Sequence, residues 1–336
     1  MQYKSNKGFN GVGQLGILLV FIGVGLIIAS IVQYIIAIAI VPPNTSRLAL
    51  EPAMKIAMTE SKNINAVRVL QALFTCFIFF VPAVFYSWVC NGKNLFWLGF
   101  NKHINVFQIM TGFLIIFTAN LMAGPLQEFS EIIVSHFPSL DSIAKNMEHA
   151  YSEQVLIISH LNGIPDLFIA LILMAFLPAL FEEVFFRGAL QNLLIKWWKQ
   201  PLLAIIFTSL LFSLIHMSVY LFISRAILGF VLGMMYYKTK NIWINIIAHF
   251  LNNAIVVASM YSMSKSKNKI DVSKIDSKIE WWAAIIAFFV LYILFEFLKR
   301  YSEKNTIKIS TTEQKLSDIN NAANFPFGVP GKDNLS

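Results

Sequence analysis

The stretch that decides the fold is residues 167–194, which reads LFIALILMAFLPALFEEVFFRGALQNLL. Its first 15 residues carry no charge, and Glu182, Glu183 and Arg187 follow within the next six. A bilayer core about 30 Å thick needs about 20 apolar residues in one helix. We therefore expect a membrane-spanning helix that carries ionisable side chains.

The whole chain shares this apolar character. Of its 336 residues, 57% are hydrophobic and 13% are charged, whereas soluble domains carry roughly 25% charged residues. This composition excludes an ordinary soluble protein. A secreted disulfide scaffold is also excluded, because Cys76 and Cys90 lie within or at the end of one apolar stretch. The net charge of +8 is assigned to the membrane surface, since no basic, aromatic-interleaved groove points to nucleic acid.

Apolar runs of bilayer length recur, so the predicted fold class is all-α, a polytopic transmembrane helix bundle of about eight spans. These spans lie at residues 15–41, 67–90, 105–124, 163–186, 201–217, 219–237, 242–262 and 281–298. The acid-rich segment 127–163 is predicted to be an interfacial amphipathic helix. The expected units are N-terminal helices with extramembrane segments (1–162), a central unit (163–262), a Lys-rich loop with the last span (263–300) and a disordered tail (301–336).

Lysine residues in the short loops predict that the N-terminus lies inside. The inner segments then hold Lys4, Lys7, Lys93, Lys102, Lys196, Lys199, Lys238, Lys240 and the cluster from Lys299 onward. One group of lysines falls in a loop that this orientation places outside, and it comprises Lys265, Lys267, Lys269, Lys274 and Lys278.

Ionisable groups inside the spans are few, and each costs roughly 2.5–3.5 kcal/mol at the bilayer centre. Glu183 and Arg187 are four residues apart, so they are predicted to pair along their helix, while Glu182 points about 100° away and is left without that partner. His216 ends the fifth span. In the seventh, His249 and Asn253 share one helical face. The predicted site thus lies on helices four, five and seven.

A carboxylate and two imidazoles in an apolar shell suit the activation of water. Glu182 would accept a proton from water, and His216 would orient that water or share the role of base. His249 and Asn253 would form an oxyanion hole for the attacked carbonyl. Alternatively, Glu182, His216 and His249 could be three ligands of a catalytic zinc. The sequence has no HExxH motif, and its residues leave the choice between metal and no metal open.

These residues resemble the motifs of the CAAX-prenyl-protease and bacteriocin-processing (CPBP) family of intramembrane endopeptidases, also called the Abi family. The family pattern is EExxxR, then FxxxH, then HxxxN or HxxxD. The chain has EEVFFR at 182–187, FSLIH at 212–216 and HFLNN at 249–253. The resemblance covers about residues 165–262, and the first four-tenths of the chain match only as hydrophobic helices.

The resemblance implies that residues 163–262 are a CAAX-protease-type catalytic core. Glu182 takes the position of the general base together with His216, and His249 and Asn253 take the oxyanion-binding positions. Glu183 and Arg187 take positions that hold the motif helix. A glutamate-dependent mechanism without metal is favoured, so no cofactor is expected, with zinc as the alternative. The implied partners are the lipid bilayer and a membrane protein or peptide substrate, and the implied location is a bacterial plasma membrane, as an integral multi-pass protein.

Two other function classes remain open for such a chain. A catalytically silent bacteriocin-immunity or scaffold protein would tolerate the loss of a motif residue, and none is lost. A transporter with a proton relay would be expected to show inverted repeats, and the sequence has none. Taken alone, His216 is more often a hydrogen-bonded packing residue than a catalyst, and Arg225 is more often a counter-ion or interfacial anchor.

Overall fold

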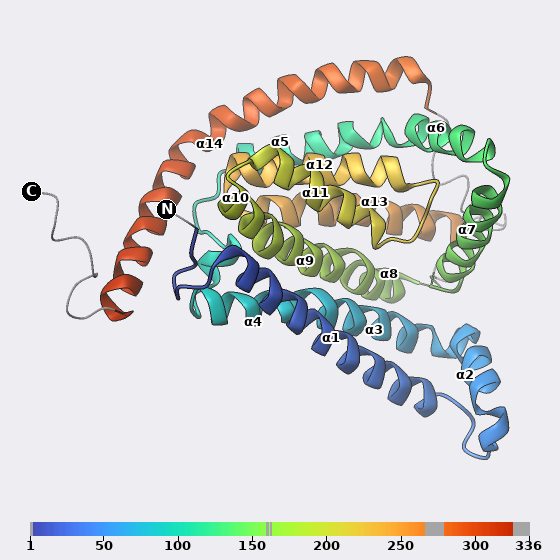
Figure 1. Ribbon diagram of the computed structural model, residues 1–336. Coiled ribbons are helices and arrows are strands. Elements are labelled where there is room, and N and C mark those ends of the chain that lie inside the picture. Colours follow the sequence, from blue (N-terminus) through green and yellow to red (C-terminus); the bar gives the residue numbers. More distant parts are fainter. Residues whose placement is uncertain (1–2, 159–160, 162, 266–278, 325–336) are drawn as a thin grey trace, which may run out of the picture.

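The computed structural model describes residues 3–158, 161, 163–265 and 279–324 (Figure 1). The helices are α1 Gly11–Ala39, α2 Leu50–Thr59, α3 Ile64–Thr75, α4 Val81–Cys90, α5 Val106–Asn120, α6 Ala123–Ser135, α7 Pro138–Ile158, α8 Ile164–Ala170, α9 Leu177–Glu183, α10 Asn192–Trp198, α11 Pro201–Leu214, α12 Phe222–Thr239, α13 Ile242–Lys265 and α14 Trp281–Asn324. Three π-helical segments, Cys76–Phe80, Leu171–Phe176 and Val184–Gln191, join α3 to α4, α8 to α9, and α9 to α10.

Six helical stretches among the described residues are long and apolar enough to cross a membrane. They are Gly11–Ala39, Ile64–Cys90, Val106–Ser135, Ile164–Trp198, Ile242–Lys265 and Trp281–Ile319. These stretches overlap six of the eight predicted spans, which confirms an all-helical, multi-pass membrane architecture.

The other two predicted spans, 201–217 and 219–237, fall on α11 and α12 and are not confirmed as spans. The 14 residues of α11 give a length of about 21 Å, which is short of a bilayer core of about 30 Å. α12 contains Arg225 near its start and Lys238 near its end, which lowers its apolar character. The two helices pack against each other as a hairpin.

Residues 181–191, at the end of α9 and along the π-helical segment after it, are all buried, and α11, α12 and α13 pack against this segment. In Figure 1 these helices lie between the long α14 on one side and α1, α3 and α4 on the other, while α7 crosses one end of the bundle. Side chains from α5, α12 and α13, such as Ile115, Leu232 and Ile244, are completely buried against one another. This packing surrounds the inner face of α13, which carries His249.

Two glycines let α12 approach its neighbours closely. A Cβ atom on Gly229 would lie 3.1 Å from the Phe212 ring, and one on Gly233 would lie 2.8 Å from Ile205. The carbonyl oxygens of these glycines accept hydrogen bonds from Arg187 Nη2 and from Gln191 Nε2, each at 3.0 Å. Arg187 and Gln191 are one helical turn apart, and so are Gly229 and Gly233. The two hydrogen bonds therefore fix the position of the motif helix along α12.

The prediction of a disordered tail is wrong for residues 301–324, because α14 continues to Asn324. Polar contacts with distant parts of the chain hold this extension. Gln108 Nε2 donates to Ser302 Oγ at 2.9 Å, and Asn305 Nδ2 donates to Gln108 Oε1 at 2.9 Å. Ser302 is buried, with 1% of its surface exposed. Residues 325–336 lie outside the described part of the chain.

Most of the acid-rich segment 127–163 is helical, but it forms two helices, the end of α6 and α7, with a turn at residues 136–137 between them. Its position at a membrane interface and the orientation of the chain stay predictions. Of the lysines that opposed this orientation, Lys265 ends α13, and Lys267, Lys269, Lys274 and Lys278 lie outside the described residues.

Candidate active site

The two acids of the EExxxR motif end α9, where the continuous helix Ile164–Trp198 enters the π-helical segment Val184–Gln191. Such π-helical turns inside α-helices occur frequently at functional sites. Both acids are buried, with 8% of Glu182 and 0% of Glu183 exposed. A buried carboxylate is costly unless it is paired or hydrogen-bonded, and the two acids differ in this respect.

Glu183 is fully paired. Its Oε1 atom accepts from Arg187 Nη1 and contacts His249 Nδ1, both at 2.9 Å, and its Oε2 atom accepts from Asn245 Nδ2 at 3.1 Å. The ion pair with Arg187 was predicted from the spacing and is present. The guanidinium group also lies over the Phe212 ring, 4.7 Å from its centroid. Glu183 therefore links its own helix to α13.

The contact with Glu183 fixes the ring of His249. An ionised carboxylate can only accept hydrogen bonds, so Nδ1 of His249 must carry the proton in this contact. The other ring nitrogen, Nε2, is thereby directed at Glu182, and its distance to Glu182 Oε2 is 3.9 Å. Glu182 and His249 therefore lie beside each other in the structure.

Glu182 has a different environment from its neighbour. Within the described part of the chain its carboxylate accepts no hydrogen bond, and its nearest charged partner is His249 Nε2. Glu182 also acts electrostatically on His216 and on Arg187. A buried carboxylate with spare acceptor capacity beside two imidazoles is suited to bind and deprotonate a water molecule.

His216 lies in the turn between α11 and α12. Its Nδ1 atom lies 2.7 Å from the carbonyl oxygen of Phe212, and because a carbonyl only accepts, Nδ1 is the protonated nitrogen. In the neutral ring, Nε2 is then unprotonated and can act as a base. The chain turns directly after this residue, since Met217 has a φ of 52°. Arg225 Nη1 donates to the His216 carbonyl oxygen at 3.4 Å, and its role as a counter-ion stays a prediction.

Asn253 is on the predicted helix, but none of the hydrogen bonds between described residues joins it to another site residue. Its Oδ1 atom accepts from Asn252 Nδ2 at 3.3 Å, and its side chain is half-buried. Asn252 in turn accepts a hydrogen bond from Asn120 of α5. With Oδ1 engaged, the Nδ2 group of Asn253 remains available as a donor.

A zinc site was the alternative for Glu182, His216 and His249. No group of three or more His, Cys, Asp or Glu side chains that could hold a metal ion occurs among the described residues. The three residues therefore do not form a ready ligand set in this geometry.

An apolar cavity of about 460 Å³ lies beside the His216 turn, between α6, α7 and the start of α12. Its walls are formed by Ser130, Ile133, Val134, Met147, Leu214, Met217, Ser218, Val219, Phe222 and Ile223. Because Leu214 and Met217 flank His216 in the chain, the cavity adjoins the candidate site. Its volume is in the range of pockets for small apolar groups.

Several residues that build the site were missed in the sequence. Asn245 donates to Glu183 and also to the carbonyl oxygen of Leu232 at 2.7 Å. It stands four residues before His249, so a search for polar residues at helical spacing around the motifs would have found it. The same search after Arg187 would have found Gln191, which is completely buried.

A comparison with family models gives an independent result. The model described as type II CAAX prenyl endopeptidase Rce1-like matches residues 164–255, which include all three motifs. A search of curated proteins found no match, and a search of solved structures found none either. The family implies a protease in a lipid bilayer that acts on a membrane-associated substrate. The resemblance read from the sequence is thus confirmed over residues 164–255 of this multi-pass membrane protein, which match the CPBP (CAAX protease) family.

Proposed function

We propose that this protein is an intramembrane endopeptidase that hydrolyses peptide bonds of a membrane protein or peptide by activating water, without a covalent intermediate. The observation that carries the proposal is the unequal pairing of the two motif acids. Glu183 is engaged by Arg187, His249 and Asn245, whereas Glu182 keeps its acceptor capacity beside His249.

In this mechanism Glu182 and the unprotonated Nε2 of His216 take a proton from a water molecule. The hydroxide oxygen attacks the peptide carbonyl, whose oxygen becomes negative in the tetrahedral intermediate. When this intermediate collapses, the C–N bond breaks and the proton held by Glu182 passes to the leaving amine. The products are a carboxylic acid and a free amine, and the base is restored.

The oxyanion would be stabilised by His249 and Asn253. Since Nδ1 of His249 already donates to Glu183, its Nε2 can donate to an oxyanion only if the ring is doubly protonated. Asn253 would supply its free Nδ2 group after a small movement towards the substrate carbonyl.

The apolar cavity beside His216 supports a membrane-associated substrate. We propose that it receives an apolar side chain of the substrate next to the bond to be cut. Among the side chains that line this cavity, the polar groups are the hydroxyls of Ser130 and Ser218. A charged side chain would lose its hydration there, so cleavage should favour sites flanked by apolar residues.

The metal question belongs to this proposal. We favour the metal-free mechanism, because the water-activating pair and the oxyanion donors are complete without an added group, and because amide groups such as Asn253 are poor zinc ligands. Metal analysis of the purified protein and a chelation series test this point. Unchanged activity after chelation is expected. About one zinc per chain, with activity lost on chelation and restored by zinc, would make Glu182, His216 and His249 metal ligands.

The experiment that tests the function compares membrane proteomes of cells with the wild-type protein and with Glu182→Ala. Uncleaved precursors should accumulate in the variant, and purified wild-type protein should cleave them. On such a substrate, Glu182→Gln should lower the rate constant by about 10²–10⁴, while Glu128→Gln, an exposed glutamate on α6, should have no effect. Turnover close to wild type in Glu182→Gln would remove this residue from the role of base.

A further inference from the structure

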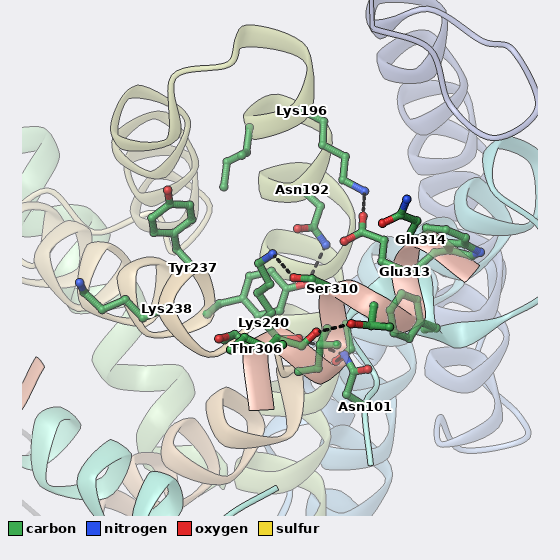
Figure 2. Close-up of a pocket in the computed structure, with 18 of the residues that line it drawn as sticks. Asn101, Asn192, Lys196, Tyr237, Lys238, Lys240, Thr306, Ser310, Glu313 and Gln314 are labelled. Atoms are coloured by element: carbon green, nitrogen blue, oxygen red, sulfur yellow. Dashed lines mark hydrogen bonds and ion pairs between the residues drawn. The ribbon is translucent and has the colours of Figure 1, made fainter. Parts of the chain in front are cut away.

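A second cavity, of about 780 Å³, lies away from the candidate active site. It is enclosed by the end of α10, the end of α12 and the second half of α14 (Figure 2). Asn192, at its wall, follows Glu182 by ten residues in one continuous helix, which corresponds to about 15 Å along the axis. Its volume would accommodate a small ligand or the headgroup of a lipid.

The walls of this cavity carry an excess of positive charge. Four lysines, Lys196, Lys238, Lys240 and Lys299, face a single acidic residue, Glu313. Clustered ammonium groups in a partly enclosed space repel one another and attract an anion. The cavity is therefore suited to an anionic ligand.

Two of the lysines are held at the centre by the C-terminal helix α14. Lys196 Nζ forms an ion pair with Glu313 Oε1 at 2.7 Å, and Lys240 Nζ donates to Ser310 Oγ at 3.0 Å (Figure 2). Lys196 also lies 5.6 Å from the centroid of the Trp97 ring. Thus, among the described residues, Lys196 has a carboxylate in direct contact, whereas Lys240 donates its hydrogen bond to a neutral hydroxyl and feels the charge of Glu313 from farther away. An incoming anion would give Lys240 a charged partner and would compete with Glu313 for Lys196.

The position of the cavity indicates where the anion comes from. It lies at the ends of membrane-spanning helices, and Trp97 and Tyr237 line it. Tryptophan and tyrosine are enriched at the level of lipid headgroups, and basic pockets between helices at that level bind anionic headgroups. A lipid phosphate has the charge and the depth in the membrane that match the lysines.

We propose that this cavity is a binding site for the phosphate group of an anionic phospholipid, with Lys196 and Lys240 as its main cationic groups. Glu313 on α14 is a built-in competitor that occupies Lys196 when no phosphate is bound. The site is separate from the proposed peptidase chemistry and does not depend on it.

The test measures equilibrium binding of short-chain phosphatidylglycerol to the full-length protein in uncharged detergent micelles, with short-chain phosphatidylcholine as the neutral-lipid comparison. Lys196→Gln and Lys240→Gln should each weaken phosphatidylglycerol binding by about fivefold, the scale of one lysine near a charged lipid surface. Glu313→Gln should strengthen it by a similar factor. Lys196→Gln and Glu313→Gln break the same ion pair. A simple loosening of α14 would therefore shift the affinity in the same direction in both variants, whereas the proposed site predicts opposite shifts.

The matched control is Lys304→Gln/Lys308→Gln, which removes two exposed lysines from the same helix outside the cavity. It should leave the affinity close to wild type. An equal loss in this control and in Lys196→Gln/Lys240→Gln, or equal binding of the two lipids, would overturn the proposal, as would weaker binding in Glu313→Gln. Competition by millimolar inorganic phosphate would support the phosphate site and assign it to a soluble ligand.

Discussion

Replacing Glu183 with glutamine tests whether its contacts stabilise the fold. Arg187 has 2% of its surface exposed, and Glu183 is its partner in the buried ion pair. Breaking a buried pair by removing one partner typically costs about 3–5 kcal/mol. Part of this cost is offset here, because Arg187 keeps the carbonyl oxygen of Gly229 at 3.0 Å and the face of Phe212. We therefore expect a loss of about 3 kcal/mol in the free energy of unfolding.

The free energy of unfolding can be measured by titration with sodium dodecyl sulfate in mixed micelles, followed by circular dichroism. The double variant Glu183→Gln/Arg187→Met should recover most of the lost stability, because it removes the uncompensated charge. It should remain inactive, since the ring of His249 still lacks the Glu183 carboxylate that orients it. A Glu183→Gln protein within about 1 kcal/mol of wild type would refute the argument that this ion pair holds the motif helix.

Other perturbations have distinct expected results. Asn253→Ala should lower the catalytic rate constant by about 10²–10³ with little change in substrate affinity. Asn252→Ala should lower the rate constant less. A large loss of affinity with an unchanged rate constant in Asn253→Ala would make Asn253 a docking residue. The hydrogen bonds from Lys145 and Tyr220 hold the pKa of Asp141 below its usual value of 3.8. The ionised Asp141 carboxylate therefore stabilises the contact of α7 with the α11–α12 turn above pH 3.8. This stabilisation is lost as the pH falls through the lowered pKa. In the wild type, hydrogen exchange of α7 should become faster when the pH falls below the lowered pKa of Asp141. Tyr220→Phe should show faster exchange already at neutral pH.

The sequence predicted the fold class because the bilayer imposes a strong constraint. A span must be long, helical and nearly free of charge, and six described stretches meet these conditions. The same rule failed for the extension of α14, whose polar residues 301–324 show no apolar periodicity. That helix is stabilised by partners such as Gln108, which is 194 residues away from Ser302. A local pattern carries no information about such contacts.

The candidate site was predictable at the level of residues but only partly at the level of contacts. Helical spacing gave the Glu183–Arg187 pair correctly. It gave no partner on α13 for Glu183, because a contact with His249 depends on how the two helices are rotated and displaced in the bundle. The π-helical segment that begins at Val184 adds to this difficulty, since it changes the rotation per residue on which helical spacing arguments depend.

The adjacent acids Glu182 and Glu183 show how one helix can supply two chemical functions. Consecutive residues point about 100° apart, so Glu183 faces Arg187 and the Asn245–His249 face of α13, while Glu182 faces the space beside His249 Nε2. A carboxylate whose oxygens are fully used as acceptors cannot also bind and deprotonate water. Conversely, a carboxylate free to take a proton cannot serve as a permanent counter-charge for a buried arginine. Under the proposed mechanism the motif therefore needs two acids in sequence, because the structural charge and the reacting charge have to be different groups.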